Sequence, residues 1–143
     1  MTQAPILLVE DNDDDADLTE MAFRDAKIGN PIVRVRDGVE AMALLHGPNA
    51  GVSEPLPVVV LLDLKLPKVG GIEVLKSIRA SEATKHLPVV VLTSSEEDRD
   101  RIEAYAHFAN SYVRKPVDYD AFVAASRELG LYWTVTNIPP PRT

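Results

Sequence analysis

The chain has 143 residues, with 22 acidic and 15 basic side chains, a formal net charge of −7 and no cysteine. A chain of this length can bury enough apolar surface without cross-links, so we expect residues 1–143 to form a single domain. The acidic balance, without a basic cluster, argues against binding to nucleic acid or to an anionic membrane. The missing cysteines exclude disulfides and cysteine-based zinc sites. The apolar run 6–9 is too short for a signal-peptide core, so we expect a cytoplasmic protein.

Apolar runs alternate with helical patterns along the whole chain, which is typical of βα units on a parallel sheet. Strands are expected at approximately residues 5–10, 31–36, 57–62, 88–93 and 111–114. Helices are expected over residues 14–26, 38–46, 71–81 and 97–110, with a last one from Asp118. Residues 47–56 are rich in Gly and Pro and are expected to form a surface loop. The pattern predicts a doubly wound α/β domain with a five-stranded parallel sheet.

Four of the expected strands run from apolar residues into polar ones at their carboxyl ends. These polar residues are Glu10 and Asp11, Asp63, Thr93, and Lys115. Ligands of an open parallel sheet bind beyond the carboxyl ends of its strands, so we expect these side chains to lie together. Acids, a hydroxyl and a lysine at one sheet edge suit a phosphate group and a magnesium ion.

The same segments resemble the four signatures of response-regulator receiver domains, in the same order. They are Val9-Glu10-Asp11-Asn12, the stretch 63–71, Leu92-Thr93-Ser94 and Val113-Arg114-Lys115-Pro116, and the resemblance covers residues 6 to about 128. It implies the flavodoxin-like strand order 2-1-3-4-5. The Asp-Leu-x-Leu-Pro-Lys segment at 63–68 and the Leu-Tyr-Trp segment at 131–133 are also similar to the single-domain regulators paired with bacterial phytochrome kinases.

Asp63 stands where the family has its phosphoacceptor, at the end of the most apolar strand. A carboxylate there can attack a phosphoryl group and hold it as an acyl phosphate. An aspartate that caps a helix or lies in a loop is the alternative. The resemblance implies a sensor histidine kinase, such as a bacterial phytochrome, as the phosphohistidine donor. The protein would then catalyse its own phosphorylation and dephosphorylation without turning over a separate substrate.

Glu10, Asp11 and Asp63 form a candidate magnesium site. Two unit charges ~4 Å apart interact by ~4 kcal/mol at an effective dielectric near 20, so clustered carboxylates repel one another unless a cation lies between them. Magnesium prefers one or two carboxylates with water and phosphate oxygens, which matches Asp11 and Asp63 as direct ligands. By resemblance, the backbone carbonyl of Lys65 is a third ligand. Many receivers have Asp at the position of Glu10, whose longer side chain is expected to act through water.

A calcium loop is the alternative interpretation of this acidic run. Asp11, Asp13 and Asp15 fit the opening of a D-x-D-x-D loop, but such a loop requires Gly at its sixth position and Glu at its twelfth, where this chain has Ala16 and Ala22. Acids in the first turn of a helix favour its positive end. We therefore expect solvated roles at the start of a helix for four acids: Asp13, Asp14, Asp15 and Asp17.

Lys115 is expected to pair with the Asp63 carboxylate and later with a phosphoryl oxygen, which limits the build-up of charge during in-line transfer. The following Pro116 makes a cis peptide accessible, since the cis form costs only about 0.5–1 kcal/mol before proline. Thr93 is expected to donate its hydroxyl to the phosphate, and Ser94 and Ser95 begin the loop that it would pull. The alternatives are a surface lysine and a buried threonine that bonds the backbone.

By resemblance, Tyr112 is the switch aromatic that moves inward with Thr93, although an aromatic residue in a strand can also do no more than pack. Moving a two-state protein from 1:99 to 99:1 requires about 5.5 kcal/mol. Hydrogen bonds to charged groups contribute roughly 1.5–3 kcal/mol each, so those of Thr93 and Lys115 nearly suffice. The family sets the lifetime of its acyl phosphate at two positions, here Lys65 and Ser95. Lys65 either shields the acyl phosphate or pairs with Glu10.

Residues 129–143 extend the last helix beyond its usual end and finish in a proline-rich tail. Tyr132 and Trp133 lie beyond the packed sheet and add more apolar side chains than a monomer needs to cover its core. Exposed aromatic patches mark interfaces. We expect a homodimer through the fourth and fifth helices and the strand between them. The alternatives are that Trp133 folds back into the core and that the helix breaks at Gly130, where glycine costs roughly 1 kcal/mol against alanine.

Two functions remain open on the sequence. One is a phosphorylation switch, and the other is a pseudo-receiver that binds proteins constitutively and transfers no phosphoryl group. The chain has no G-x-x-x-x-G-K-[ST] loop, no G-x-G-x-x-G and no G-x-S-x-G elbow. It also has no DNA-binding module after the receiver, so we expect its output to pass through another protein. The complete set of acids, hydroxyl and lysine favours the switch.

Overall fold

The computed structural model describes residues 4–48, 55–94, 96–115 and 118–141. Its centre is a five-stranded sheet in which neighbouring strands are parallel, in the order β2-β1-β3-β4-β5. The strands are β1 (Ile6–Val9), β2 (Ile32–Val35), β3 (Val59–Leu62), β4 (Val89–Thr93) and β5 (Ser111–Arg114). Each strand lies within its expected range, and the order implied by the resemblance is confirmed.

The register brings the carboxyl ends of the central strands to one edge of the sheet. Val9 at the end of β1 pairs with Leu62 at the end of β3. Thr93 at the end of β4 pairs with Arg114 at the end of β5. The residues that follow these strands therefore meet at the edge where the sequence predicts the site.

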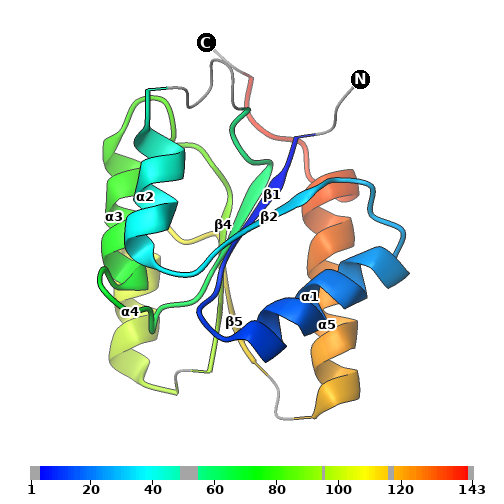
Figure 1. The fold of residues 1–143 in the computed structure, drawn as a ribbon. Coiled ribbons are helices and arrows are strands. Elements are labelled where there is room, and N and C mark those ends of the chain that lie inside the picture. The colour runs from blue at the N-terminus through cyan, green and yellow to red at the C-terminus, as the bar shows by residue number, and fades with distance from the viewer. Residues whose placement is uncertain (1–3, 49–54, 95, 116–117, 142–143) are drawn as a thin grey trace.

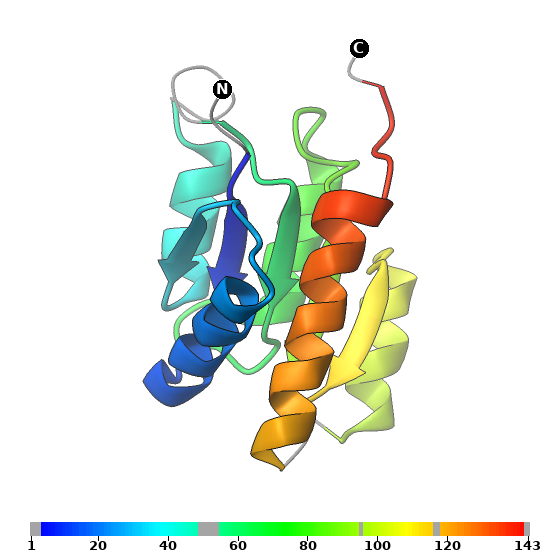
Figure 2. The same ribbon diagram turned by 90° about the vertical axis from the view of Figure 1, so that its right-hand side faces the viewer.

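Helices cover both faces of the sheet (Figure 1). α2 (Gly38–His46), α3 (Gly71–Ala80) and α4 (Asp98–Ala106) lie on one face, and α1 (Asp13–Asp25) and α5 (Tyr119–Leu131) lie on the other. Figure 2 shows α1 and α5 in front of the sheet and the other three helices behind it. This is the doubly wound arrangement that the alternating pattern predicts.

The side chains of each central strand alternate between two apolar cores. In β1, Leu7 and Val9 enter the core that also contains α2 and α3 residues, whereas Ile6 and Leu8 enter the core that contains Phe23 of α1. A parallel strand covered on both faces is apolar in continuous runs rather than alternating ones. This explains why the strands that lead to the site are the most apolar parts of the chain.

α4 ends at Ala106, four residues before the end expected from the sequence. The chain turns at Phe108, whose φ of 65° lies in the left-handed region. Asn110 then joins the turn to the start of β4, because its side-chain oxygen accepts a hydrogen bond from the Val89 N–H at 2.8 Å. Glycine is the usual residue at such a helix end, so this stop carried no signal in the sequence.

α5 does not break at Gly130; it continues to Leu131 and then as a π-helical turn, Tyr132–Thr136. A Cβ at Gly130 would collide with Cδ1 of Ile28 and lie 3.3 Å from two ring carbons of Phe23, so glycine here permits the close approach of α5 to α1. Trp133 is only 8% exposed and packs into the second core. The alternative in which Trp133 folds back is therefore the one that the structure has.

The end of the sheet opposite the predicted site carries both ends of the described chain. Ala4 and Pro139–Pro141 line one hollow there, together with residues that precede β3 and β4, among them Pro57 and Pro88. Residues 49–54 of the expected loop lie outside the described residues. Among the described helices, none is long and apolar enough to cross a membrane.

Candidate functional site

The backbone of the site is an extension of the sheet. The Asp63 N–H donates to the Val9 carbonyl at 3.1 Å, and the Lys115 N–H donates to the Thr93 carbonyl at 2.8 Å. The hydrogen-bonded ladder thus continues one residue beyond β3 and β5. Asp63 and Lys115 therefore start from fixed backbone positions at neighbouring points of the same edge.

Asp63 is buried, 6% exposed, and both of its carboxylate oxygens have donors. Oδ1 accepts the Thr93 hydroxyl at 2.8 Å and the Lys65 backbone N–H at 3.1 Å. Oδ2 lies 3.2 Å from the Lys115 Nζ. The carboxylate is held as an acceptor in one orientation, and Thr93 bonds this side chain rather than only the backbone.

Lys115 gathers carboxylates around its ammonium group. Its Nζ lies 2.9 Å from Asp15 and 3.2 Å from Asp63, and it also bonds Glu10. The side chain is only 7% exposed. Burial alone would lower the pKa of Lys115, but hydrogen bonds to Glu10 and Asp15 and the charge of Asp63 outweigh burial and raise it. Lys115 is therefore a permanent buried cation of the site and not a surface lysine.

Asp15 corrects the sequence interpretation, which treated it as one of four solvated acids. It lies in the first turn of α1, and its carboxylate bonds Lys115 at 2.9 Å. Asn12 caps this helix by accepting the Asp15 N–H at 2.9 Å, which fixes where the turn begins. No signal in the sequence singles it out, because Asp13, Asp14 and Asp17 stand beside it as acids of the same helix start. Asp13, Asp14 and Asp17 are exposed as expected.

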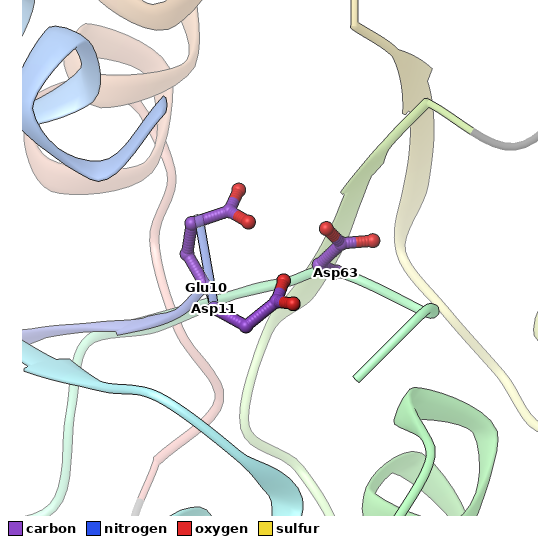
Figure 3. Close-up of side chains that lie close together, drawn as sticks. All are labelled: Glu10, Asp11 and Asp63. Carbon is purple, nitrogen blue, oxygen red and sulfur yellow. The ribbon is translucent and has the colours of Figure 1, made fainter. Parts of the chain in front are cut away.

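Three carboxylates come close enough to hold one metal ion (Figure 3). One oxygen each from Glu10, Asp11 and Asp63 lie within 4.8 Å of one another. Figure 3 shows them close together, two from the end of β1 and one from the end of β3. Glu10 and Asp63 are buried and Asp11 is exposed, so the cluster opens toward solvent on one side. Carboxylate oxygens are the ligands that Mg²⁺ prefers, and the residues present therefore fit this ion.

The surroundings of Glu10 disfavour its charged form. Burial raises its pKa to about 7, with the Asp63 charge adding to the rise and the bonds to Lys115 and the Asn12 N–H opposing it. With Asp11 and Asp15 nearby, negative charge exceeds the single positive charge of Lys115. A divalent cation would relieve this imbalance.

The calcium-loop alternative does not survive the structure. The residues at the sixth and twelfth positions of such a loop, Ala16 and Ala22, lie inside α1 and are buried against the core. A helix over Asp13–Asp25 cannot wrap around an ion as a twelve-residue loop does. The acidic run instead begins a helix whose first turn faces the site.

Lys65 pairs with Glu97 and not with Glu10. Its Nζ lies 3.5 Å from the Glu97 carboxylate beside α4, and both side chains are about half exposed. Of the two roles considered for this lysine, a pair with Glu10 is therefore wrong. Ser95, the second of the positions associated with acyl-phosphate lifetime, and the peptide bond of Lys115 to Pro116 lie outside the described residues.

Tyr112 is half-buried in β5, beside α4. Its ring lies 6.5 Å from the ring of Tyr105, at an angle of 37°. It also lines a hollow together with Glu97, Arg101 and Arg114. The side chain thus has a neighbouring space on the α4 side, as a residue that changes position requires.

The two residues expected at a dimer interface differ in exposure. Tyr132 is 49% exposed, whereas Trp133 is 8% exposed and stacks edge-on against Tyr132 with 4.9 Å between ring centroids. A side chain buried in its own core is not available to a second chain. The expectation of an interface contact by Trp133 is therefore wrong for this arrangement, and Tyr132 remains available.

Comparison with known proteins agrees with the fold. A sequence model described as the response regulator receiver domain matches residues 6–127. FilR2 of Methanothrix harundinacea, described as a probable methanogenesis regulatory protein, is 42% identical over 135 residues, or 94% of this chain and 86% of that protein. The response regulator Rcp1 of Synechocystis is 35% identical over 94% of this chain and 92% of its own length.

Solved structures extend this similarity to the coordinates. The Mn²⁺-bound form of Rcp1 superposes with a TM-score of 0.89 at 34% identity, over 97% of this chain and all of that one. The phosphorylated cyanobacterial phytochrome response regulator RcpA gives 0.91 at 34% identity, over 98% of this chain and all of that one. With the sequence match over residues 6–127, these findings show that the chain belongs to the response regulator receiver domain family.

Proposed function

We propose that the protein is a single-domain response regulator of a two-component system that accepts a phosphoryl group on Asp63. One observation carries the proposal: a buried carboxylate receives the Thr93 hydroxyl at 2.8 Å and faces the Lys115 ammonium at 3.2 Å, beside a group of acids that fits a divalent cation. An aspartate that only caps a helix or lies in a loop does not require both a buried lysine and a hydroxyl as donors. A phosphoacceptor needs both.

The proposed transfer begins with a carboxylate oxygen of Asp63, which attacks the phosphorus of a phosphohistidine on a sensor histidine kinase. A P–O bond forms, the P–N bond breaks, and the histidine nitrogen keeps the electron pair and takes up a proton. Lys115 and Thr93 are fixed donors next to the oxygens on which charge develops, and preorganised donors of this kind lower the barrier. Attack by water on the acyl phosphate later restores Asp63 and releases inorganic phosphate.

Glu10, Asp11 and Asp63 are the residues that would hold Mg²⁺, with the Lys65 carbonyl as a further ligand. When bound, the ion supplies charge neutralisation for the carboxylates and for the phosphoryl oxygens. The similarity to Rcp1, which was solved with Mn²⁺, supports a divalent ion at this site. Lys115 and Thr93 keep their roles toward Asp63 as described above.

The proposed output is a change at the face formed by α4, β5 and α5. Once Asp63 is phosphorylated, Thr93 would donate its hydroxyl to the phosphoryl group, and Tyr112 would follow it into the space beside α4. Phosphorylation adds a charge of about −1.5 to −2, which is enough to reorder hydrogen bonds at this edge. The similarity to RcpA, which was solved in phosphorylated form, supports this cycle.

The partners proposed are a sensor histidine kinase and a downstream protein in the cytoplasm, with neither nucleic acid nor membrane. RcpA is a cyanobacterial phytochrome response regulator, which supports a phytochrome kinase. FilR2, described as a probable methanogenesis regulatory protein, is an equally long match from a different biological setting. We therefore propose the kinase class from the site, and the phytochrome link from RcpA and Rcp1.

A homodimer through α4, β5 and α5 remains part of the proposal. Ile102 and Tyr105 of α4 are 68% and 51% exposed, and Tyr132 is 49% exposed. Sedimentation velocity over a range of concentrations tests the dimer, and we expect the wild type to associate and Tyr105→Arg to stay monomeric. A wild-type protein that sediments as a monomer at every concentration would exclude it.

Incubation with Mg²⁺ and acetyl phosphate, followed by intact-mass spectrometry, tests the proposed function. We expect a base-labile gain of one phosphoryl group in the wild type and none in Asp63→Asn. Asp17→Asn, which removes an exposed acid of α1 outside the site, should gain the group like the wild type. A wild type that gains no phosphoryl group would favour the pseudo-receiver, which binds proteins without phosphotransfer.

A further inference from the structure

Arg34 of β2 reaches the site edge from a strand that supplies none of the predicted site residues. Its Nε and Nη2 both donate to the backbone carbonyl of Glu10, at 2.9 and 2.8 Å. Its Nη1 donates to the Asp13 carboxylate at 2.8 Å. The Arg34 side chain is only 16% exposed, whereas Asp13 is 62% exposed, so the bonds to the Glu10 carbonyl are the ones shielded from solvent. One guanidinium thus joins the end of β1 to the start of α1.

The segment that Arg34 holds is the one that presents the metal-site acids. β1 ends at Val9 and α1 begins at Asp13, so Glu10, Asp11 and Asn12 form the whole connection. The Glu10 N–H donates to the Val35 carbonyl of β2 at 3.0 Å. With Arg34 on its carbonyl, both polar groups of the Glu10 backbone are therefore fixed to β2.

We propose that Arg34 is a positioning residue for the metal ligands Glu10 and Asp11. The negative charges of the acids repel one another and would displace this three-residue connection. The guanidinium fork, meaning the Nε and Nη2 groups that both donate to the Glu10 carbonyl, holds the connection in place before any cation binds. Arg34 acts through the Glu10 backbone and not by contact with the ion. The proposal rests on the metal site of the proposed function.

If Arg34 positions the metal ligands, removal of its guanidinium weakens metal binding; if Arg34 acts only through its charge, removal strengthens metal binding. A cation near a group of acids repels a second cation, so the loss of its charge alone would tighten the binding of a divalent ion. The loss of the fork would loosen the acids and weaken binding. Removal of groups that orient metal ligands typically weakens metal affinity about 10–100-fold. The sign of the change therefore separates the two effects.

Arg36, which directly follows β2, provides a matched control. Its Nη1 also lies 2.8 Å from Asp13, so it carries the same charge and shares one partner with Arg34. The hydrogen bonds to the Glu10 carbonyl come from Arg34 among the described residues. Arg36→Gln therefore removes an equal charge at a similar place and leaves the fork on Glu10 intact.

The experiment is a titration of metal-free protein with Mn²⁺, in which electron paramagnetic resonance reports the free ion. Circular dichroism of each variant reports the folded fraction. We expect Arg34→Gln to bind Mn²⁺ about tenfold more weakly than the wild type. Arg34→Lys keeps the charge without the planar fork and should also bind more weakly, whereas Arg36→Gln should bind as the wild type does or slightly more tightly.

Three outcomes overturn the inference. They are an Arg34→Gln affinity equal to or above that of the wild type, an equal loss in Arg36→Gln, and wild-type affinity in Arg34→Lys. If Arg34→Gln does not fold, Arg34→Lys decides alone. A wild type that binds no Mn²⁺ would refute the metal site of the proposed function together with this inference. A wild type that binds while Arg34→Gln binds equally well would refute the inference only.

Discussion

Arg79 at the amino end of the parallel sheet and Lys115 at its carboxyl end are held by opposite kinds of partner. At the amino end, the Arg79 guanidinium donates to backbone carbonyls of Lys85, Leu87 and Phe108 at 2.7–3.2 Å, and to the Asn110 side-chain oxygen at 3.1 Å. These partners are uncharged dipoles. At the carboxyl end, Lys115 bonds charged carboxylates, and more acids lie around it than it can neutralise.

This difference in partners distinguishes the amino end of the sheet, which has a structural role, from the carboxyl end, which has the functional one. Arg79 joins α3 to the segments that precede β4 and β5, and every donor that it uses meets a fixed acceptor. The carboxyl end keeps an excess of buried acids, which lowers stability until a ligand compensates. Proteins break the rules of stable packing at functional sites and satisfy them elsewhere, and this chain does both within one sheet.

Replacement of Arg79 should have the largest effect on folding. Arg79→Met leaves the carbonyls of Leu87 and Phe108 without their charged donor, and hydrogen bonds to charged groups contribute roughly 1.5–3 kcal/mol each. We expect the free energy of unfolding to fall by about 3 kcal/mol in urea titrations. Arg99→Met is the control, since Arg99 makes an exposed pair with Glu97 and such pairs contribute about 0–1 kcal/mol. Equal losses in the two variants would contradict the distinction between the ends.

Magnesium should stabilise the opposite end by a similar amount. A ligand that binds only the folded state at 100 times its dissociation constant adds about 2.7 kcal/mol to the free energy of unfolding. We expect this gain in urea titrations of the wild type with Mg²⁺, its loss on addition of EDTA, and a much smaller gain in Asp63→Asn. An undiminished gain in Asp63→Asn would place the ion elsewhere.

Gly130 tests how tightly the amino end is packed. Gly130→Ala gains about 1 kcal/mol in helix propensity but forces a methyl group against Ile28 and Phe23, and overpacking costs typically 1–3 kcal/mol. We expect a net loss of about 1 kcal/mol in the free energy of unfolding. Ile28→Val removes the Cδ1 methyl that a new Cβ would meet, so the penalty should shrink in the double variant. A penalty of the same size there would mean that the collision is not its cause.

Asp37 tests whether every carboxylate at the carboxyl end of the sheet destabilises the fold. Its replacement should change the stability least of the four predictions. The Glu40 N–H bonds its carboxylate at 2.8 Å and, with the nearby Lys68 charge, holds the pKa below its ordinary value of 3.8. A lowered pKa gives stability that is present above pH 3.8 and is lost as the pH falls through the folded-state pKa. Acid titration followed by circular dichroism should therefore show a smaller loss in Asp37→Asn than in the wild type. An identical acid transition would contradict this role.

The sequence predicted the sheet and most of the site for one physical reason. Polar residues that directly follow buried strands need no long-range information, because parallel strands bring their carboxyl ends together. Asp11, Asp63, Thr93 and Lys115 could be identified in this way. Arg34 could not, because its role depends on a side chain that crosses to a neighbouring strand and bonds a backbone carbonyl.

The other differences between the sequence prediction and the structure concern residues that the sequence pattern alone could not tell apart. Asp15 contacts Lys115, but other acids adjoin it in the sequence, and only the helix phase set by the Asn12 cap distinguishes it. Trp133 matches an exposed interface residue in its pattern, yet the close approach at Gly130 and the π-helical turn carry it into the core. Tertiary packing decided these positions, and local sequence did not.

The shared hollow of Ala4 and Pro139–Pro141 has a consequence for engineering the protein. Chain ends that lie together can be joined by a short linker, and new ends can then be opened in a surface loop. An opening between α2 and β3 would leave Arg79, the connection at Glu10 and the strands that carry Asp63 and Lys115 uncut. A circular permutant of this design should retain the receiver fold and could carry a reporter far from the phosphoacceptor.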